Sequence, residues 1–144
     1  MTLPSELPLA NLAAEQPELA GYPSSRQSLP PGEIAEGAYA VRYASSVEEL
    51  DAILRLRFEV FNVELREGLE ESFATGRDQD EFDAQCHHLL VEHRPSGRVI
   101  GTYRIQTAAM ALAARGFYTG TEFDLSRLPA EIVAQSVEVG RACI

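Results

Sequence analysis

The chain has no lysine, and the twelve Lys or Arg positions among its 144 residues are all arginines. A Schiff base and the phosphate-binding lysine of a P-loop both need a lysine amine, so the enzymes that use either one are excluded. Acidic residues outnumber the arginines, and the formal net charge is -10. Nucleic acid and anionic membrane surfaces attract clustered cations, so we expect no nucleic-acid partner, and any anionic ligand must meet a local group of arginines.

Cysteines and long apolar runs are also scarce. Cys86 and Cys143 are the only cysteines, and the N-terminus lacks the basic start and apolar run of a secretory signal. The sequence therefore predicts a reduced, cytoplasmic protein without disulfides. No apolar run approaches the roughly 20 residues that a membrane-spanning helix needs.

Motifs of three common kinds of site are missing. Neither Gly-x-Ser-x-Gly nor Gly-x-Gly-x-x-Gly occurs, so a serine hydrolase and a dinucleotide-binding enzyme have no support. His87, His88 and His93 lie on one predicted strand, but adjacent strand residues point to opposite faces, and the outer two are about 20 Å apart. Histidines so placed do not share one ion, and we expect no metal site.

The composition indicates one soluble globular domain preceded by an arm. Of the residues, 45% are hydrophobic and 24% are charged, which fits a core of ordinary size. Six of the eight prolines fall in the first 31 residues, where no hydrophobic period is sustained. We therefore expect residues 1–38 to form a disordered or loosely ordered arm and residues 39–144 to hold the fold.

Within residues 39–144 the hydrophobic pattern predicts an α/β protein. A strand at 39–44 precedes a helix from about 47 to 65, which Ser46 and Glu49 begin as a capping box. A long acidic connection follows it. The later elements, in chain order, are an antiparallel hairpin of 87–93 with 98–106, helices at 108–115 and 129–135, and an apolar strand at 137–144.

The apolar strand at 137–144 stands at the end of the chain. A strand this apolar is normally central, and no crossover or further element follows it to cover its side chains. The sequence therefore predicts a half-wound α/β sheet that is truncated after its central strand.

Charged side chains stand at positions where the hydrophobic pattern predicts core. Arg57 falls at the centre of the apolar stripe on the predicted helix at 47–65. That stripe consists of Leu50, Ile53, Leu54, Phe61 and Leu65. Charges are rarely kept in a core unless they are paired or used, so we predict that they converge in a single pocket. The full set is Arg57, Asp80, Asp83, Arg104, Glu138 and Arg141.

The last two members of this set need an irregular strand to act together. Glu138 and Arg141 are three residues apart, so an ideal strand would aim them at opposite faces. A bulge at Gly140 would bring both to one face, and bulges are frequent beside active sites. Arg104, taken alone, fits better as an ordinary edge arginine whose stem covers apolar surface.

Several motifs in order carry a resemblance to a known family. They are Arg57-Phe-Glu-Val-Phe61, Asp80-Glu-Phe-Asp83, His88-Leu-Leu-Val91, Gly101-Thr-Tyr-Arg104, Gly116-Phe-Tyr118, Glu122-Phe-Asp-Leu-Ser126 and Glu138-Val-Gly-Arg141. Over residues 40–144 the chain resembles the ornithine-lipid N-acyltransferase family, the hemolysin-like branch of the GNAT superfamily, which is related to acyl-homoserine-lactone synthases.

The resemblance implies a fold and an activity. The fold is a GNAT-like mixed sheet flanked by helices, of which this chain would hold the N-terminal part without the donor-binding half. The activity is transfer of a fatty acyl group from acyl carrier protein to the α-amine of ornithine or a similar small amino acid. No cofactor is implied, because the thioester of acyl carrier protein or coenzyme A is a co-substrate, and the lipid product would place the enzyme near a membrane.

The resemblance also implies roles for particular residues. Glu138 and Arg141 are the predicted catalytic residues, and we expect a partly dry cleft to raise the pKa of Glu138 so that it accepts a proton from the amine. The arginines either order the acidic loop or bind the substrate carboxylate. The predicted substrate-binding residues are Arg57, Phe61, Asp80, Asp83, Arg104 and Phe117.

Two alternatives to this function stay open at the level of sequence. One is a lactone-forming synthase related to the homoserine-lactone branch, with S-adenosylmethionine as the acceptor. The other is an inactive truncated remnant or binding module that keeps the half-sheet without catalysing transfer.

Overall fold

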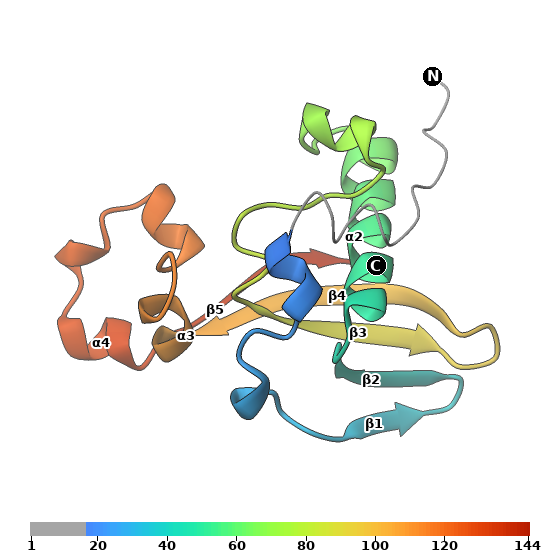
Figure 1. The fold of residues 1–144 in the computed structure, drawn as a ribbon, viewed down its shortest axis with the longest axis horizontal. Coiled ribbons are helices and arrows are strands. Elements are labelled where there is room, and N and C mark those ends of the chain that lie inside the picture. Colours follow the sequence, from blue (N-terminus) through green and yellow to red (C-terminus); the bar gives the residue numbers. More distant parts are fainter. Residues whose placement is uncertain (1–16) are drawn as a thin grey trace.

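The computed structural model describes residues 17–144, and five antiparallel strands form its centre. They pair in sequence order, β1-β2-β3-β4-β5, as Figure 1 shows. The predicted α/β class is confirmed, but every pairing among the described strands is antiparallel, whereas a mixed sheet was expected. The strands are β1 (Glu33–Glu36), β2 (Tyr39–Tyr43), β3 (His87–His93), β4 (Arg98–Thr107) and β5 (Val137–Cys143).

Helix α2 (Val47–Phe58) packs on one face of the sheet against β3 and β4 (Figure 1). It begins at the predicted cap, where the Ser46 hydroxyl accepts a hydrogen bond from the Glu49 amide at 3.3 Å. The Glu49 carboxylate in turn accepts one from the Ser45 amide at 2.8 Å. The buried side of the helix packs against the fully buried Leu90 of β3, through Leu50, Ile53 and Leu54.

The end of this helix differs from the prediction. Residues Glu59–Glu64 form a π-helix, η3, and the Leu65 amide donates to the Val60 carbonyl five residues earlier at 2.9 Å. A wider turn rotates each later side chain away from the α-helical stripe. Leu65 is therefore 54% exposed, and its assignment to the core was wrong.

Order begins well before residue 39. The 3₁₀-helix η1 (Pro17–Gly21) lies beside α2, and its Leu19 joins the core. Tyr22 is also buried: its hydroxyl donates to the Ala44 carbonyl and accepts from the His88 amide, both at 3.2 Å. The prediction of a loose arm is therefore wrong for residues 17–38, because two buried anchors order a segment that has no hydrophobic period. The rest of the predicted arm lies outside the described residues.

The predicted hairpin is confirmed, since β3 and β4 pair across the turn at 94–97. Between β4 and β5 the chain forms a small projection, residues 108–136, which we call the lobe and which lies at the left of Figure 1. Gln85 ties it to the sheet, because its amide donates to the Gly116 carbonyl at 2.9 Å and accepts from the Arg115 amide at 3.2 Å. The lobe consists of α3 (Ala108–Leu112), η5 (Tyr118–Thr121), η6 (Leu125–Arg127) and α4 (Ala130–Ala134).

A connection at 66–86 joins η3 to β3 and includes the 3₁₀-helix η4 (Glu70–Ala74). Over residues 17–144, none of the helices combines the length and the apolar character that crossing a membrane requires.

Candidate active site

The acidic loop at 78–83 is organised around Asp83, which is fully buried. Arg57 of α2 donates to both Asp83 oxygens at 2.8 and 3.3 Å and to Asp78 at 2.8 Å. The Asp80 amide adds a third hydrogen bond to the Asp83 carboxylate at 2.8 Å. Arg57 and its two carboxylate partners are 0% exposed, so this arginine holds the loop and does not meet a substrate.

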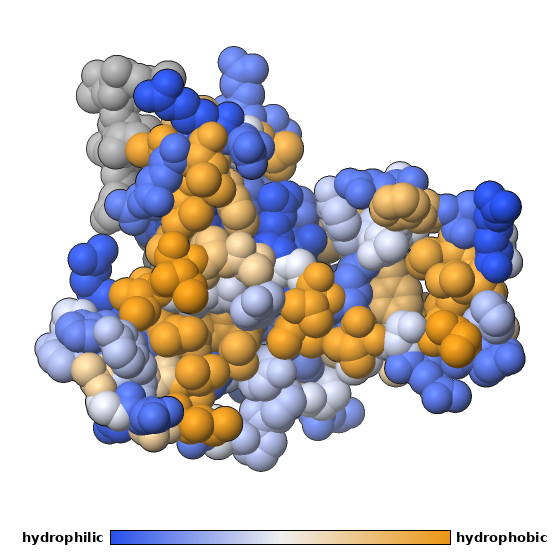
Figure 2. Space-filling model, turned by 180° about the vertical axis from the view of Figure 1, so that it is seen from behind, coloured by the Kyte–Doolittle hydropathy of each residue, from blue (hydrophilic) through white to orange (hydrophobic). Residues whose placement is uncertain are grey.

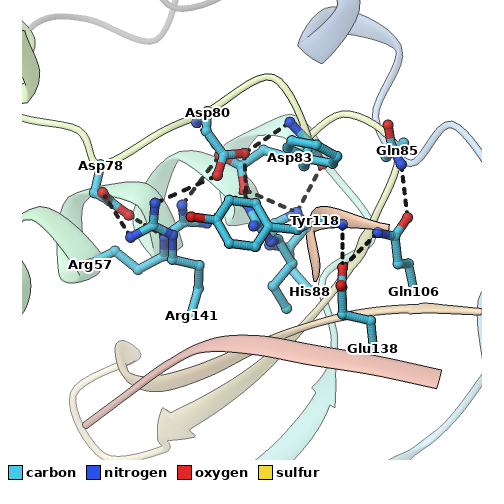
Figure 3. A network of polar contacts seen from close by, with 12 residues as sticks. Arg57, Asp78, Asp80, Asp83, Gln85, His88, Gln106, Tyr118, Glu138 and Arg141 are labelled. Carbon is cyan, nitrogen blue, oxygen red and sulfur yellow. Dashed lines mark hydrogen bonds and ion pairs between the residues drawn. The ribbon is translucent and has the colours of Figure 1, made fainter. Parts of the chain in front are cut away.

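Arg104 of β4 and Arg141 of β5 complete the cluster, and Figure 3 shows Arg141 beside Arg57. Arg104 donates to Asp80 at 2.7 Å and to Asp83 at 2.9 Å. Arg141 is held more loosely, by ion pairs of 3.7 Å to Asp78 and 3.6 Å to Asp80. Three arginines thus face three aspartates. Five of the six core charges that were predicted to converge meet here, whereas Glu138 lies outside the cluster and Asp78 was not predicted.

The buried ion pairs shift the pKa values of their members. Burial alone would raise the pKa of Asp83, but Arg57, His88 and Arg104 outweigh it and hold that pKa well below its usual range. Burial would likewise lower the pKa of Arg57, and the Asp83 and Asp78 carboxylates raise it instead. Both groups stay charged across the physiological range, so the cluster is a fixed ionic unit.

Arg141 occupies a bulge in β5. Thr102 pairs with Cys143 and Arg104 with Gly140, so β5 carries one more residue than β4 over this stretch. Arg141 has φ of 48°, in the left-handed region that few residues other than glycine adopt. The predicted bulge therefore lies directly after Gly140, and Figure 3 shows Glu138 and Arg141 rising from the same side of the strand.

Arg141 also has the most open guanidinium of the three. Its side chain is 22% exposed, against 6% for Arg104 and 0% for Arg57. It lies over the ring of Phe61 at 5.8 Å. Across residues 17–144, neither Asp78 Oδ1 nor Asp80 Oδ2 receives a hydrogen bond, so Arg141 is the cation that balances these two buried oxygens.

Glu138 is bound differently from the prediction. Its Oε1 accepts from Gln106 at 2.8 Å and from the Tyr118 amide at 2.9 Å, and its Oε2 accepts from the Thr119 amide at 2.6 Å and the Thr119 hydroxyl at 2.5 Å. Burial would raise the pKa of Glu138, but these bonds stabilise the charged form and lower it. The expected rise was wrong, because four donors outweigh partial desolvation.

A cavity of about 70 Å³, the central cavity, joins Glu138 to the arginine cluster. Arg104 contributes to its wall, and the guanidinium lies 5.6 Å from the ring centre of Tyr118, so Tyr118 links the two halves of the site. Cys86 also lines the cavity, but burial raises the pKa of its thiol to about 12. It therefore supplies no thiolate nucleophile near neutral pH.

The structure places the predicted site residues in different surroundings. Arg57, Asp80 and Asp83 form the buried ionic unit, whereas Arg104 and Arg141 extend from it toward the central cavity and solvent. Phe61 supports Arg141. Phe117 lies on the far side of Glu138 and lines a second cavity in the lobe.

Three residues of the site were missed at the level of sequence. Asp78 was missed because an irregular loop has no periodicity that assigns its side chains to a face. Gln106 carried a usable signal, since it lies at every-second-residue spacing on the same face of β4 as the buried Thr102 and Arg104. Thr119 carried none, because it acts partly through its backbone amide.

Buried His88 gives a prediction for acid stability. Burial lowers its pKa to about 4, whereas an unfolded chain has about 6.5. The unfolded state therefore binds more protons between these values, so the stability is fully present above pH 6.5 and decreases as the pH falls toward 4, by about 3 kcal/mol in all. The variant His88→Gln, which keeps a donor for the Asp83 carbonyl, should flatten this part of the curve in urea unfolding measured at several pH values.

A second feature of the same curve serves as an internal control. The loss below about pH 4, which comes from protonating Asp83, should persist in the variant, because the Asp83 pKa is lowered by its arginines. An unchanged slope between pH 6.5 and 4 after His88→Gln would contradict the assignment.

Comparison with known proteins assigns the chain to a family. The family profile described as the Acetyltransferase (GNAT) domain matches residues 56–144. A protein of Agrobacterium fabrum named L-ornithine N(alpha)-acyltransferase is 36% identical over 115 residues, which cover 75% of this chain and 39% of the relative. Proteins of the same name from Brucella abortus and Rhizobium meliloti are 36% and 35% identical over 118 and 113 residues, covering 75% and 72% of this chain.

These matches cover 41% of the Brucella protein and 37% of the Rhizobium protein, so the chain spans about two fifths of the length of its curated relatives. No solved structure gives a significant match. The resemblance inferred from the motifs is confirmed by the shared name of these relatives and by the family profile. The chain therefore belongs to the GNAT acetyltransferase-domain family.

Proposed function

We propose that the chain is the acceptor-binding part of an N-acyltransferase, which moves a fatty acyl group from the thioester of acyl carrier protein to the α-amine of ornithine or a similar amino acid. The observation that carries the proposal is that Glu138 and the loosely held Arg141 rise from one bulged strand beside the ionic cluster. The names of the relatives support the substrate class.

Arg141 binds the carboxylate of the amino acid in this proposal. A guanidinium can hold a carboxylate through two parallel hydrogen bonds. Arg57 is fully buried, and Arg104 already donates to two aspartates, so neither has the freedom of Arg141. Its ion pairs of 3.6 and 3.7 Å are too long for hydrogen bonds, so its donors can turn to a ligand while Phe61 supports the planar group.

Glu138 supplies a fixed negative charge in this proposal and does not act as the proton-accepting base that the sequence predicted. The amine arrives as the free base and attacks the thioester carbonyl, and its nitrogen then carries a positive charge. The ionised Glu138 stabilises that charge through the Thr119 hydroxyl, which lines the central cavity. The charged nitrogen of the tetrahedral intermediate is acidic, so it can lose its proton to solvent water before the carbon–sulfur bond breaks and the thiolate leaves.

Transfer is direct in this scheme, without an acyl-enzyme. The cysteine of the central cavity has a pKa raised to about 12, so the thiol is not poised for attack. No cofactor is needed, because the thioester itself activates the acyl group. The fatty-acyl amide would partition into lipid, which would bring the enzyme near a membrane surface through its product.

An amide-forming assay tests the proposal. The chain, and any longer product of its gene, is incubated with ornithine and a decanoyl thioester of either acyl carrier protein or coenzyme A. Mass spectrometry is expected to detect decanoyl-ornithine, made faster from the carrier-protein thioester. Ornithine methyl ester is the matched control, since it keeps the amine and loses the carboxylate that Arg141 would bind, and it should react at least tenfold more slowly.

The same assay separates the alternatives. Release of a lactone from S-adenosylmethionine, without amide from ornithine, would favour the synthase branch. Absence of any acylated product from either thioester would overturn the proposal and favour a binding module.

A further inference from the structure

The lobe contains a second, partly open cavity of about 170 Å³, the lobe cavity. Four stretches of the chain build its walls: η5 with the residue before it, η6 with the residue after it, the helix α4, and the start of β5. The view from behind in Figure 2 shows hydrophobic surface gathered on the lobe, at the right of the molecule. The apolar wall residues are Phe117, Leu125, Leu128, Val133 and Val137.

The lobe cavity adjoins the central cavity. Thr119 and Glu138 line both, and the hydrogen bonds between them form the shared wall. Most residues that line the central cavity are polar, including Arg104, whereas most residues that line the lobe cavity are apolar, with Thr119, Ser136 and Glu138 as the exceptions. A ligand that has a polar reacting group and an apolar tail could therefore place one part in each cavity.

The size and polarity of the lobe cavity favour a hydrocarbon chain. An apolar cavity of about 150 Å³ holds benzene, so about 170 Å³ accepts roughly six carbons. The side chain of ornithine carries a positive charge, and Glu138, the ionised group in the lining of this cavity, already accepts four hydrogen bonds, so burying that charge among the apolar walls would be costly. Leu128 at the rim is 49% exposed, so a longer chain can continue along apolar surface.

We propose that the lobe cavity binds about six carbons of the fatty acyl chain next to the reacting carbonyl, and thereby selects long over short acyl donors. The inference rests on the proposed function, since it takes the acyl group to react in the central cavity. The amino acid then lies on the Arg141 side of Glu138, and the acyl chain on the side of Phe117.

A binding experiment tests the cavity without requiring catalysis. Methyl resonances of ¹³C-labelled leucine and valine are followed while 1-octanol is added, with ethanol as the short-chain control. We expect saturable shifts at Leu125 and Val137 with octanol and none with ethanol. The variant Val133→Trp fills the cavity and should weaken octanol binding at least tenfold, whereas Ile132→Trp, at an exposed neighbouring position of α4, should change it less than twofold.

An activity experiment tests the consequence for chain length. Val133→Trp should lower the ratio of kcat/KM for decanoyl over acetyl thioester at least tenfold, and Ile132→Trp should leave the ratio within twofold. An active parent whose ratio is unchanged by Val133→Trp would overturn the assignment and leave the proposed function intact. A parent that makes no amide would overturn the proposed function, and the octanol titration would then decide the cavity: no saturable shift, or equal binding by both variants, would refute it.

Discussion

Replacing Arg57 by methionine is expected to lower the free energy of unfolding by about 3–5 kcal/mol, the range found when one partner of a buried ion pair is removed. The guanidinium makes three hydrogen bonds of 2.8 to 3.3 Å to Asp78 and Asp83. Methionine preserves much of the volume but offers these carboxylates no donor where water does not reach them. Urea unfolding followed by circular dichroism measures the loss.

Arg98→Met is the matched control, because Arg98 is exposed at the start of β4, and its effect should stay below about 0.5 kcal/mol. A double-mutant cycle tests the coupling directly. Asp83→Asn should cost less stability in the Arg57→Met background than in the parent, since the charge that it removes is by then partly unpaired. Equal costs in the two backgrounds would show that the two groups do not act as a unit.

Replacing Glu138 by alanine is expected to lower kcat/KM for amide formation by about 10²–10³-fold, the effect of losing one preorganised electrostatic group. The change removes the charge and also releases the amides of Tyr118 and Thr119, which the carboxylate holds at 2.9 and 2.6 Å. Hydrogen exchange at these two amides should therefore accelerate in the variant. Faster exchange would show that the carboxylate positions the lobe, an effect that is distinct from the loss of charge at the reaction centre.

The pH profile distinguishes the proposed role of Glu138 from that of a base. The pKa of Glu138 is lowered, so the carboxylate stays ionised throughout the neutral and alkaline range. The rise of kcat/KM between pH 6 and 9 should thus follow deprotonation of the amino-acid substrate and should persist after Glu138→Ala. Disappearance of that rise in the variant would restore the role of general base.

The convergence of the charged cluster could be predicted from the sequence for a definite physical reason. A charge at an apolar position of a regular element must be buried, and buried charges require partners. Arg57 in the stripe of α2 met this condition, and Arg104 on an inward position of β4 met it too. The pairing of particular arginines with particular aspartates could not be predicted, because loop residues such as Asp78 follow no period.

The sign of the pKa shift at Glu138 shows where such prediction stops. Two of its four donors are backbone amides, and every residue except proline carries that group, so no side-chain pattern marks the ones that matter. They come from positions 118 and 119, about twenty residues earlier in the chain. Their approach depends on how the lobe returns to β5, which is a property of the whole fold.

The backbone of Arg141 is strained, although its side chain balances two buried carboxylate oxygens. A left-handed backbone is disfavoured for a residue with a side chain by about 1–2 kcal/mol, and glycine avoids that penalty. Glycine at position 141 would relieve this strain, but it would leave Asp78 Oδ1 and Asp80 Oδ2 without their cation and would remove the guanidinium that our proposal assigns to the substrate. Engineering for higher thermal stability should therefore keep arginine at position 141.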